Sequence, residues 1–173
     1  PRIAILGGGL CGRLTALQLA EQGLSVALFD KGGRKGGNAA AYVAAAMLAP
    51  AAEAVEATPE VIKLGRQSIP LWRNIRGRLK TPTMMQENGS LIVWHGQDKP
   101  LSSEFVRHLK RGGVADDEIV RWRADDIAKR EPQLGGRFSD GIYLPTEGQL
   151  DGRQMLSALA DALDGLNVPC HWE

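Results

Sequence analysis

The sequence predicts an α/β fold in which a doubly wound parallel sheet is interleaved with a second, mainly β domain. Two observations predict it. Within residues 2–30, an apolar strand, a glycine-rich turn, a helical stretch and a second apolar strand follow one another, the order of a βαβ unit. Strand and turn signals dominate residues 80–145, and a capped helix with a final apolar stretch follows at 146–173. We therefore expect both ends of the chain to build the parallel sheet.

The first turn has the G-x-G-x-x-G spacing of a dinucleotide-binding fingerprint. It follows the apolar run 3–6, which is typical of a buried parallel strand. The three glycines serve a tight turn, a close approach of the backbone to a pyrophosphate, and close packing of helix on strand, in that order. The residues predicted to bind the cofactor here are Gly7, Gly9, Leu10, Cys11 and Gly12.

The second strand of this unit ends in an acidic residue. Gly23 is expected to end the first helix, and the strand 26–29 leads to Asp30 and Lys31, which we include in the predicted site. A carboxylate at this place can accept hydrogen bonds from the ribose hydroxyls of an adenosine, and it would repel a 2′-phosphate. NAD or FAD therefore fits better than NADP. The alternative is an ordinary strand–helix turn in which Asp30 is a turn residue or a helix cap.

A run of small residues after this strand favours FAD over NAD. Residues 38–50 are rich in alanine, so the backbone can approach a flat isoalloxazine ring closely. The residues predicted to line the flavin are Ala40, Ala41, Ala45, Ala46 and Met47. The alternatives are an alanine-rich helix and a core methionine.

Three stretches resemble the D-amino-acid oxidase and glycine oxidase family of FAD enzymes: residues 7–30, 41–50 and 141–151. The resemblance implies a Rossmann-type FAD domain and hydride transfer from an amine C–H to flavin, with a small amine or amino acid as substrate. It also places the substrate-binding Arg and Tyr in a C-terminal half, so no catalytic residue is predicted. This chain departs from the family at Ala46, where Gly is usual, and at Ala40 and Ala41, where Ser or Thr is favoured. Backbone contacts to the cofactor are therefore expected instead of hydroxyl contacts.

Within the family, the sequence of this chain resembles most the flavoproteins that accompany oxidases carrying a cysteine tryptophylquinone. That resemblance implies a flavin-dependent oxygenase that modifies a tryptophan of a quinoprotein partner. A third hypothesis is a non-catalytic dinucleotide-binding subunit. A general amine or amino-acid oxidoreductase is the leading interpretation.

The predicted domain segments are 1–79 and 146–173 for the FAD domain and 80–145 for the substrate-type β domain. Because two domains of this family need roughly twice 173 residues, we expect the chain to cover an N-terminal half. The terminal stretch 167–173 is expected to enter the sheet as a strand.

Local signals predict several further elements. A helix should begin at Pro59, with Thr58 as its cap, and should be kinked or split by Pro70. Asn88-Gly89 predicts a hairpin between residues 83–87 and 90–95. Expected helix boundaries elsewhere are Ser102 as a start, Gly112 and Gly113 as an end, and Asp151 with Gln154 as a capping box.

Composition restricts the function classes. The net charge of +1, with both signs interspersed, does not indicate a nucleic-acid-binding surface. Two cysteines are too few for a disulfide framework, and no apolar run reaches the roughly 20 residues that span a bilayer. We therefore expect a cytoplasmic protein with no membrane partner. The three histidines lack ligand spacing, so no metal site is predicted. Trp94 and His95 are expected to pack in a core or to line a substrate cavity.

Overall fold

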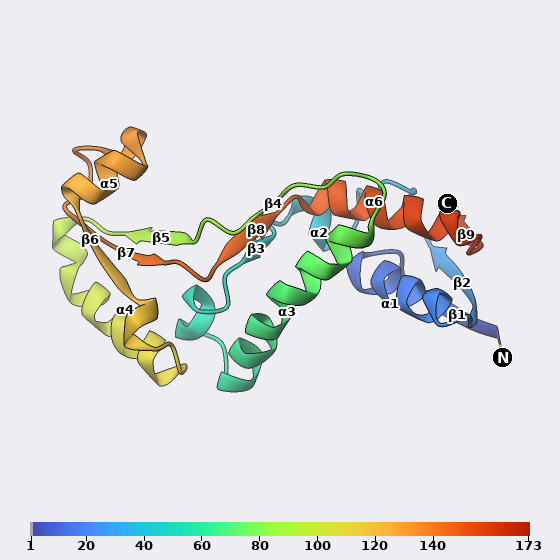
Figure 1. Ribbon diagram of the computed structural model, residues 1–173, viewed down its shortest axis with the longest axis horizontal. Coiled ribbons are helices and arrows are strands. Elements are labelled where there is room, and N and C mark those ends of the chain that lie inside the picture. Colours follow the sequence, from blue (N-terminus) through green and yellow to red (C-terminus); the bar gives the residue numbers. More distant parts are fainter. Residues whose placement is uncertain (1) are drawn as a thin grey trace. The chain divides into compact units, whose positions relative to one another are not determined.

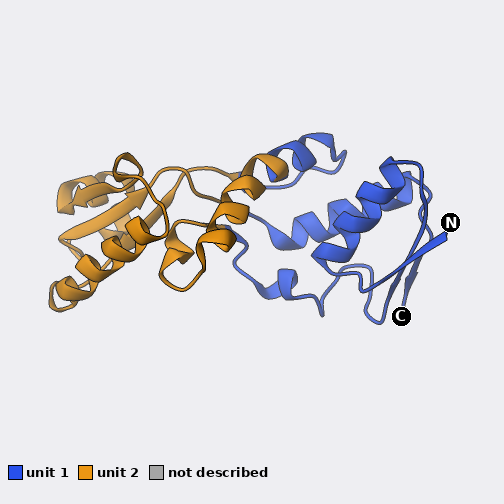
Figure 2. Cartoon of the chain, turned by 90° about the horizontal axis from the view of Figure 1, so that it is seen from below, with its two compact units in different colours: residues 1–47, 72–85, 150–173 blue, residues 48–71, 86–149 orange. Residues whose placement is uncertain are grey.

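The computed structural model describes residues 2–173, and the chain divides into two compact units. Unit 1 contains residues 1–47, 72–85 and 150–173, and unit 2 contains residues 48–71 and 86–149 (Figure 2). The units differ from the predicted segments chiefly at 48–71, which packs in unit 2. That the units serve as FAD and substrate domains stays a prediction.

Unit 1 is built on a parallel sheet that both ends of the chain supply (Figure 1). Its strands are β1 (Arg2–Leu6), β2 (Ser25–Asp30) and β9 (Cys170–Trp172), with β2 in the middle. Helix α1 (Leu10–Glu21) connects β1 to β2 and packs against α6 (Gly152–Gly165), which precedes β9. The α/β class, the βαβ order and the entry of the terminal stretch into the sheet are confirmed.

Helix α6 supplies most of the core of unit 1. It buries a row of apolar side chains, namely Met155, Leu156, Leu159 and Leu163, while α1 buries Ala16 and Leu17. Burying each leucine removes apolar surface worth about 1.5–3 kcal/mol from water.

Helix α6 starts at a side-chain cap. The Asp151 carboxylate accepts hydrogen bonds from the backbone amides of Arg153 and Gln154, both at 2.9 Å, which confirms half of the predicted capping box. The other half is wrong. The side-chain oxygen of Gln154 accepts a hydrogen bond from the Met84 amide at 2.8 Å, so it joins another segment of the chain to the helix start.

Strand β1 is more exposed than its apolar sequence predicts. It lies at the edge of the sheet and pairs with β2. Leu6, at its carboxyl end, is 84% exposed. No residue of the run 3–6 is buried, since Ile3 and Ile5 are half-buried and the others are exposed, so the expected burial of this run is wrong.

Unit 2 contains an antiparallel sheet with β7 (Asp140–Leu144) in the middle. Its neighbours are β5 (Ser90–Val93) and β6 (Val120–Arg123), and two helices belong to the same unit, α4 (Lys99–Arg111) and α5 (Ala124–Arg130). The core joins β7 to α4 and to a short 3-10 helix at Ala52–Val55, and its buried residues include Ala54, Ile62, Leu109, Ile142 and Leu144.

The predicted hairpin at Asn88-Gly89 is wrong. Strand β4 (Met85–Gln86) lies in the order β3–β8–β4 with β3 (Met47–Leu48) and β8 (Gly148–Leu150), whereas β5 pairs with β7. The turn instead contacts β7 and the segment that links β7 to β8. The Gly89 amide donates to the Glu147 carbonyl at 2.9 Å, and the Tyr143 hydroxyl donates to the Asn88 carbonyl at 2.9 Å. Because residues 140–150 pair with both flanking strands, the two strands do not pair with each other.

Helix boundaries agree in part with the sequence. Helix α3 (Pro59–Arg78) begins at Pro59 as predicted, but Pro70 lies inside it and does not split it. Helix α4 starts at Lys99, three residues before the predicted Ser102, and ends before Gly112 as predicted. The alanine-rich segment forms only one helical turn, α2 (Ala40–Val43), so the alternative of an alanine-rich helix holds for those four residues and not for the rest of the segment.

Candidate functional site

A cavity of about 440 Å³ opens at the carboxyl ends of the strands of unit 1. Its lining consists of Leu6, Gly7, Phe29, Asp30, Lys31, His171, Trp172 and Glu173. Parallel α/β sheets bind ligands at this edge. The rings of Phe29 and His171 stack along one wall, with centroids 4.6 Å apart. The structure thus places three predicted site residues, Gly7, Asp30 and Lys31, around one cavity.

The glycines of the fingerprint have the geometry that their spacing predicts. Gly7 has a φ of +106°, which favours glycine, and its amide donates to the Phe29 carbonyl at 2.8 Å. A Cβ on Gly12 would overlap the Gly7 carbonyl oxygen, so α1 packs directly on the turn. A Cβ on Gly9 would meet only Ala39, at 3.9 Å. Among residues 2–173, no other atom beyond Gly9 and its chain neighbours lies within 4 Å of that added Cβ, so the space beside Gly9 is open.

Helix α1 begins directly behind this open space. Gly9 is its N-cap, and among residues 2–173 no side chain caps this end and no acidic residue lies in its first turn. Leu10 and Cys11 are the first helical residues, and the Cys11 thiol is exposed. Backbone amides at such an end are available to an anion, which the helix dipole also attracts.

Asp30 is tied to the glycine turn. Its Oδ2 accepts a hydrogen bond from the Gly8 amide at 2.5 Å, and its Oδ1 accepts one from the Gly32 amide at 2.7 Å. A Cβ on Gly8 would overlap Trp172 and Asp30, so this position has no room for a side chain. Sequence reasoning missed the role of Gly8, although three consecutive glycines at 7–9 were a signal for it.

The small-residue segment packs against the start of α6. A Cβ on Gly152 would overlap the Ala41 carbonyl and would lie 3.6 Å from the Ala46 side chain. The Ala46 carbonyl accepts a hydrogen bond from the Leu150 amide at 3.1 Å. Ala46 adopts a φ of +53°, in the left-handed region that favours glycine.

The remaining members of the segment are more open. Ala40 and Ala45 are exposed, and Met47 is 54% exposed at the start of β3. The structure therefore brings Ala41 and Ala46 together, and it brings Ala39 to the glycine turn. Met47 does not pack in the core, so the alternative of a core methionine is wrong.

Arg13 is a residue of the site region that sequence reasoning missed. Its side chain is fully buried, with 0% exposure, and donates to the carbonyl oxygens of Gly8 (2.5 Å), Leu156 (2.6 Å) and Arg34 (2.8 Å). The guanidinium also lies over the Trp172 ring, 4.7 Å from its centroid. Burial is the main cause that lowers the pKa of Arg13. The available signal was its place on the buried stripe of α1.

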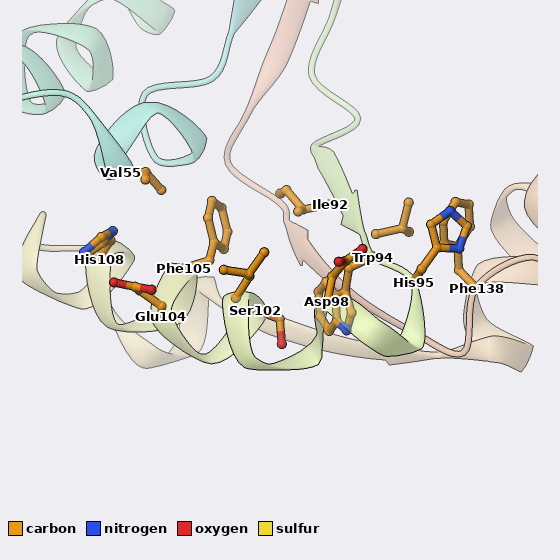
Figure 3. A pocket seen from close by; sticks show the side chains of 12 residues that line it. Val55, Ile92, Trp94, His95, Asp98, Ser102, Glu104, Phe105, His108 and Phe138 are labelled. Carbon is orange, nitrogen blue, oxygen red and sulfur yellow. The ribbon is translucent and has the colours of Figure 1, made fainter.

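A second cavity, of about 640 Å³, lies within unit 2 (Figure 3). Its aromatic and imidazole side chains are Trp94, His95, Phe105, His108 and Phe138. Trp94 also packs against the core of unit 2, so it meets both sequence-based alternatives, core packing and cavity lining. The rings of His95 and Phe138 lie 4.9 Å apart at one end.

Residues 2–173 contain neither a candidate metal site nor a candidate membrane-spanning helix. No group of three or more His, Cys, Asp and Glu side chains in this range could hold a metal ion. None of the helices in this range combines the length and apolarity needed to cross a membrane.

Comparison with known proteins decides the family. The model of the DAO family, described as FAD dependent oxidoreductase, matches residues 2–173. The chain belongs to this family. The expected resemblance to D-amino-acid and glycine oxidases and the expected FAD dependence of the family are thus confirmed.

Individual relatives agree with this assignment. The chain is 34% identical over 163 residues to a protein assigned as the thiamine biosynthesis oxidoreductase ThiO of Rhizobium etli, covering 94% of this chain and 46% of that protein. It is 29% identical over 167 residues to the glycine oxidase of Geobacillus kaustophilus, covering 92% and 42%. The crystal structure of an iminodiacetate oxidase from Chelativorans has the same fold, with a TM-score of 0.82 at 19% identity, covering 99% of this chain and 47% of that one. The chain thus spans about half the length of the curated relatives it matches.

Proposed function

We propose that this chain binds FAD at the glycine turn and Asp30, as part of a flavoenzyme that oxidises a small amine or amino acid. The observation that carries the proposal is the uncapped N-terminus of α1 behind the open space at Gly9, with the Asp30 carboxylate held beside it. An anionic pyrophosphate and a ribose fit these two features.

The glycine turn would hold the pyrophosphate. Gly7 shapes the turn, Gly9 leaves room for the phosphates, and Gly12 brings α1 close to β1. Leu10 and Cys11 would offer the first backbone amides of α1. A pyrophosphate there gains from charge-assisted hydrogen bonds and from the helix dipole.

The cavity at the strand ends would hold the adenosine. Asp30 stands at the end of β2, where a carboxylate can accept hydrogen bonds from ribose hydroxyls. Lys31 is exposed beside it, and the stacked rings of Phe29 and His171 offer an apolar wall. These features support a dinucleotide without a 2′-phosphate.

The small-residue segment would lie along the flavin. Ala40, Ala41, Ala45, Ala46 and Met47 are proposed for this role. Alanine side chains donate no hydrogen bonds, so only backbone groups of the four alanines can contact the flavin in that way. The Ala46 carbonyl accepts a hydrogen bond from the Leu150 amide, which would hold the backbone of this segment in place beside the flavin.

The reaction class follows from the cofactor and the relatives. Bound FAD would accept a hydride from a substrate carbon next to an amine nitrogen. The names of two relatives, glycine oxidase and iminodiacetate oxidase, point to amino-acid substrates, and this supports the same class here. The chain's own residues would hold and orient the cofactor.

A substrate panel tests the proposed reaction. Under anaerobic conditions, glycine, a D-amino acid or another small amine should bleach the flavin absorbance of the purified full-length flavoenzyme, of which this chain is proposed to be part, within seconds. A panel that leaves the flavin oxidised would contradict the proposal.

A second assay distinguishes this amine oxidation from the alternative reaction, the oxygenation of a tryptophan in a quinoprotein partner. If a quinoprotein is the true partner, co-expression should add oxygen to one of its tryptophans, visible as a mass increase, while the amine panel fails. Failure of both assays would favour the non-catalytic dinucleotide-binding subunit.

A further inference from the structure

Arg13 is a buried cation whose hydrogen bonds end on neutral groups. Its three acceptors are the carbonyl oxygens of Gly8, Leu156 and Arg34. These three bonds engage each guanidinium nitrogen once and leave its charge in place, and arginine stays protonated in proteins. Asp30, the carboxylate that acts on Arg13 electrostatically, already accepts hydrogen bonds from two backbone amides. Asp30 is therefore the anion that offsets the buried charge of Arg13, because hydrogen bonds from neutral amides do not cancel the charge of a carboxylate.

The contact of Arg13 with the glycine turn determines the orientation of a backbone amide. The carbonyl of Gly8 belongs to the peptide group that also carries the Gly9 amide. A trans peptide is planar, so its carbonyl and its N–H point in opposite directions. Because the guanidinium holds the Gly8 carbonyl at 2.5 Å, it fixes the Gly9 amide to point away from Arg13.

The other side of Gly8 is fixed by Asp30. The Gly8 amide donates to the Asp30 carboxylate, and a side chain at Gly8 would overlap Trp172. Trp172 in turn lies over the Arg13 guanidinium, at 4.7 Å. Arg13, Asp30 and Trp172 therefore hold both peptide groups of Gly8 before any ligand arrives.

Resting on the FAD-binding function proposed above, we propose that Arg13 is a positioning residue for the dinucleotide. It acts through the Gly8 carbonyl to aim the Gly9 amide at the pyrophosphate. Arg13 itself does not contact the reacting atoms. Its effect should therefore appear in cofactor affinity, beyond any effect on folding.

Two substitutions separate the hydrogen-bonding geometry of the guanidinium from its charge. Arg13→Gln removes the charge and the guanidinium fork, whereas Arg13→Lys keeps the charge and loses the fork. Both leave buried carbonyls without partners, so both should lower the melting temperature of the cofactor-free protein. Leu163→Ala is the matched control, because Leu163 is fully buried in α6 and is not among the partners of Arg13. It should lower the melting temperature and leave FAD affinity unchanged.

The experiment titrates FAD into each cofactor-free protein by flavin fluorescence and measures the melting temperature with and without FAD. We expect Arg13→Gln to raise the dissociation constant for FAD about tenfold, which corresponds to about 1.4 kcal/mol, with Arg13→Lys between it and the wild type. The rise in melting temperature that FAD causes should shrink accordingly. If Arg13→Gln does not fold, Arg13→Lys carries the test through the same two readouts.

A purely structural role for Arg13 gives a different result. The variants would then melt lower but bind FAD within about twofold of the wild type, as Leu163→Ala does, and the proposal would be overturned. If the wild-type protein itself binds no FAD, the proposed function fails before the role of Arg13 is reached.

Discussion

The backbone amide of Gly8 donates a hydrogen bond to Oδ2 of Asp30, with 2.5 Å between nitrogen and oxygen. The bond joins the turn after β1 to the end of β2, two points 22 residues apart in the sequence. The carboxylate is therefore held in place by the turn that is proposed to bind phosphate. The two halves of the proposed dinucleotide site are parts of one hydrogen-bonded arrangement.

Replacing Asp30 by Asn should weaken both the hydrogen bonds of the glycine turn and the binding of FAD. Asn has a single acceptor oxygen, whereas the carboxylate accepts from the Gly8 and Gly32 amides at the same time. We expect the dissociation constant for FAD to rise about tenfold, because about 1.4 kcal/mol of charge-assisted hydrogen bonding is lost. FAD titration of Asp30→Asn measures this. Asp125→Asn, in α5 of unit 2, is the control and should bind as the wild type does.

Two glycines of the fingerprint should respond differently to an added methyl group. Gly9→Ala should fold and lose FAD, because a Cβ there meets only Ala39 while it occupies the proposed phosphate space. Gly12→Ala should lower the melting temperature even without cofactor, since its Cβ would overlap the Gly7 carbonyl. Gly77→Ala, a helical position of α3 with no atom within 4 Å of its Cβ, should be neutral or stabilising by up to about 1 kcal/mol. Equal FAD retention in Gly9→Ala and Gly77→Ala would refute the assignment of Gly9.

Ala46 should tolerate glycine better than its neighbour Ala44 does. The left-handed conformation at Ala46 costs an L-residue about 1–2 kcal/mol, which the substitution Ala46→Gly would relieve, offset by about 0.5–1 kcal/mol of backbone entropy. Ala44 is extended, with φ −68° and ψ 149°, so glycine there brings only the entropic loss. Urea unfolding should show Ala46→Gly at or above wild-type stability and Ala44→Gly below it. The reverse order would contradict the assigned backbone conformation.

Glu147 should make stability depend on pH. Its carboxylate is fully buried and accepts hydrogen bonds from the Ala51 and Ala52 amides at 2.7 and 2.8 Å. Burial raises the pKa of Glu147 in the folded state, against the opposing effect of these amides. The folded protein therefore binds a proton more tightly than the unfolded chain does, and the stabilisation is lost as pH rises through the raised pKa.

A comparison with Glu147→Gln isolates this contribution, because Gln keeps one acceptor oxygen and does not titrate. The wild type should be most stable relative to Glu147→Gln below the pKa of an unfolded glutamate and should lose that advantage as pH rises. Melting temperatures from acid to neutral pH measure the difference. A wild-type advantage that grows with pH would contradict the direction of the shift.

The βαβ unit could be predicted because its signals are local. The apolar strand, the glycine spacing at 7, 9 and 12, and the terminal Asp30 lie within 30 residues, and the structure places them as β1, α1 and β2. The helix cap at Asp151 is equally local. In each case a short stretch of sequence determines the backbone geometry.

The missed features depend on contacts between distant residues. The Asn88-Gly89 turn failed as a hairpin because residues 140–150 offer pairing partners to both flanking strands. Arg13 was missed because its acceptors lie 5, 21 and 143 residues away in the chain. Leu6 is exposed at the carboxyl end of β1, where it lines the cavity, and the apolar run alone does not reveal this.

The identity of the bound cofactor tests the central claim most directly. The purified full-length flavoenzyme, of which this chain is proposed to be part, is denatured by heat, and the released small molecules are separated and identified by chromatography. We predict FAD, released without covalent attachment to the chain, because the turn at Gly9, the carboxylate of Asp30 and the small-residue segment together fit it. Recovery of NAD alone, or of no dinucleotide, would contradict the account.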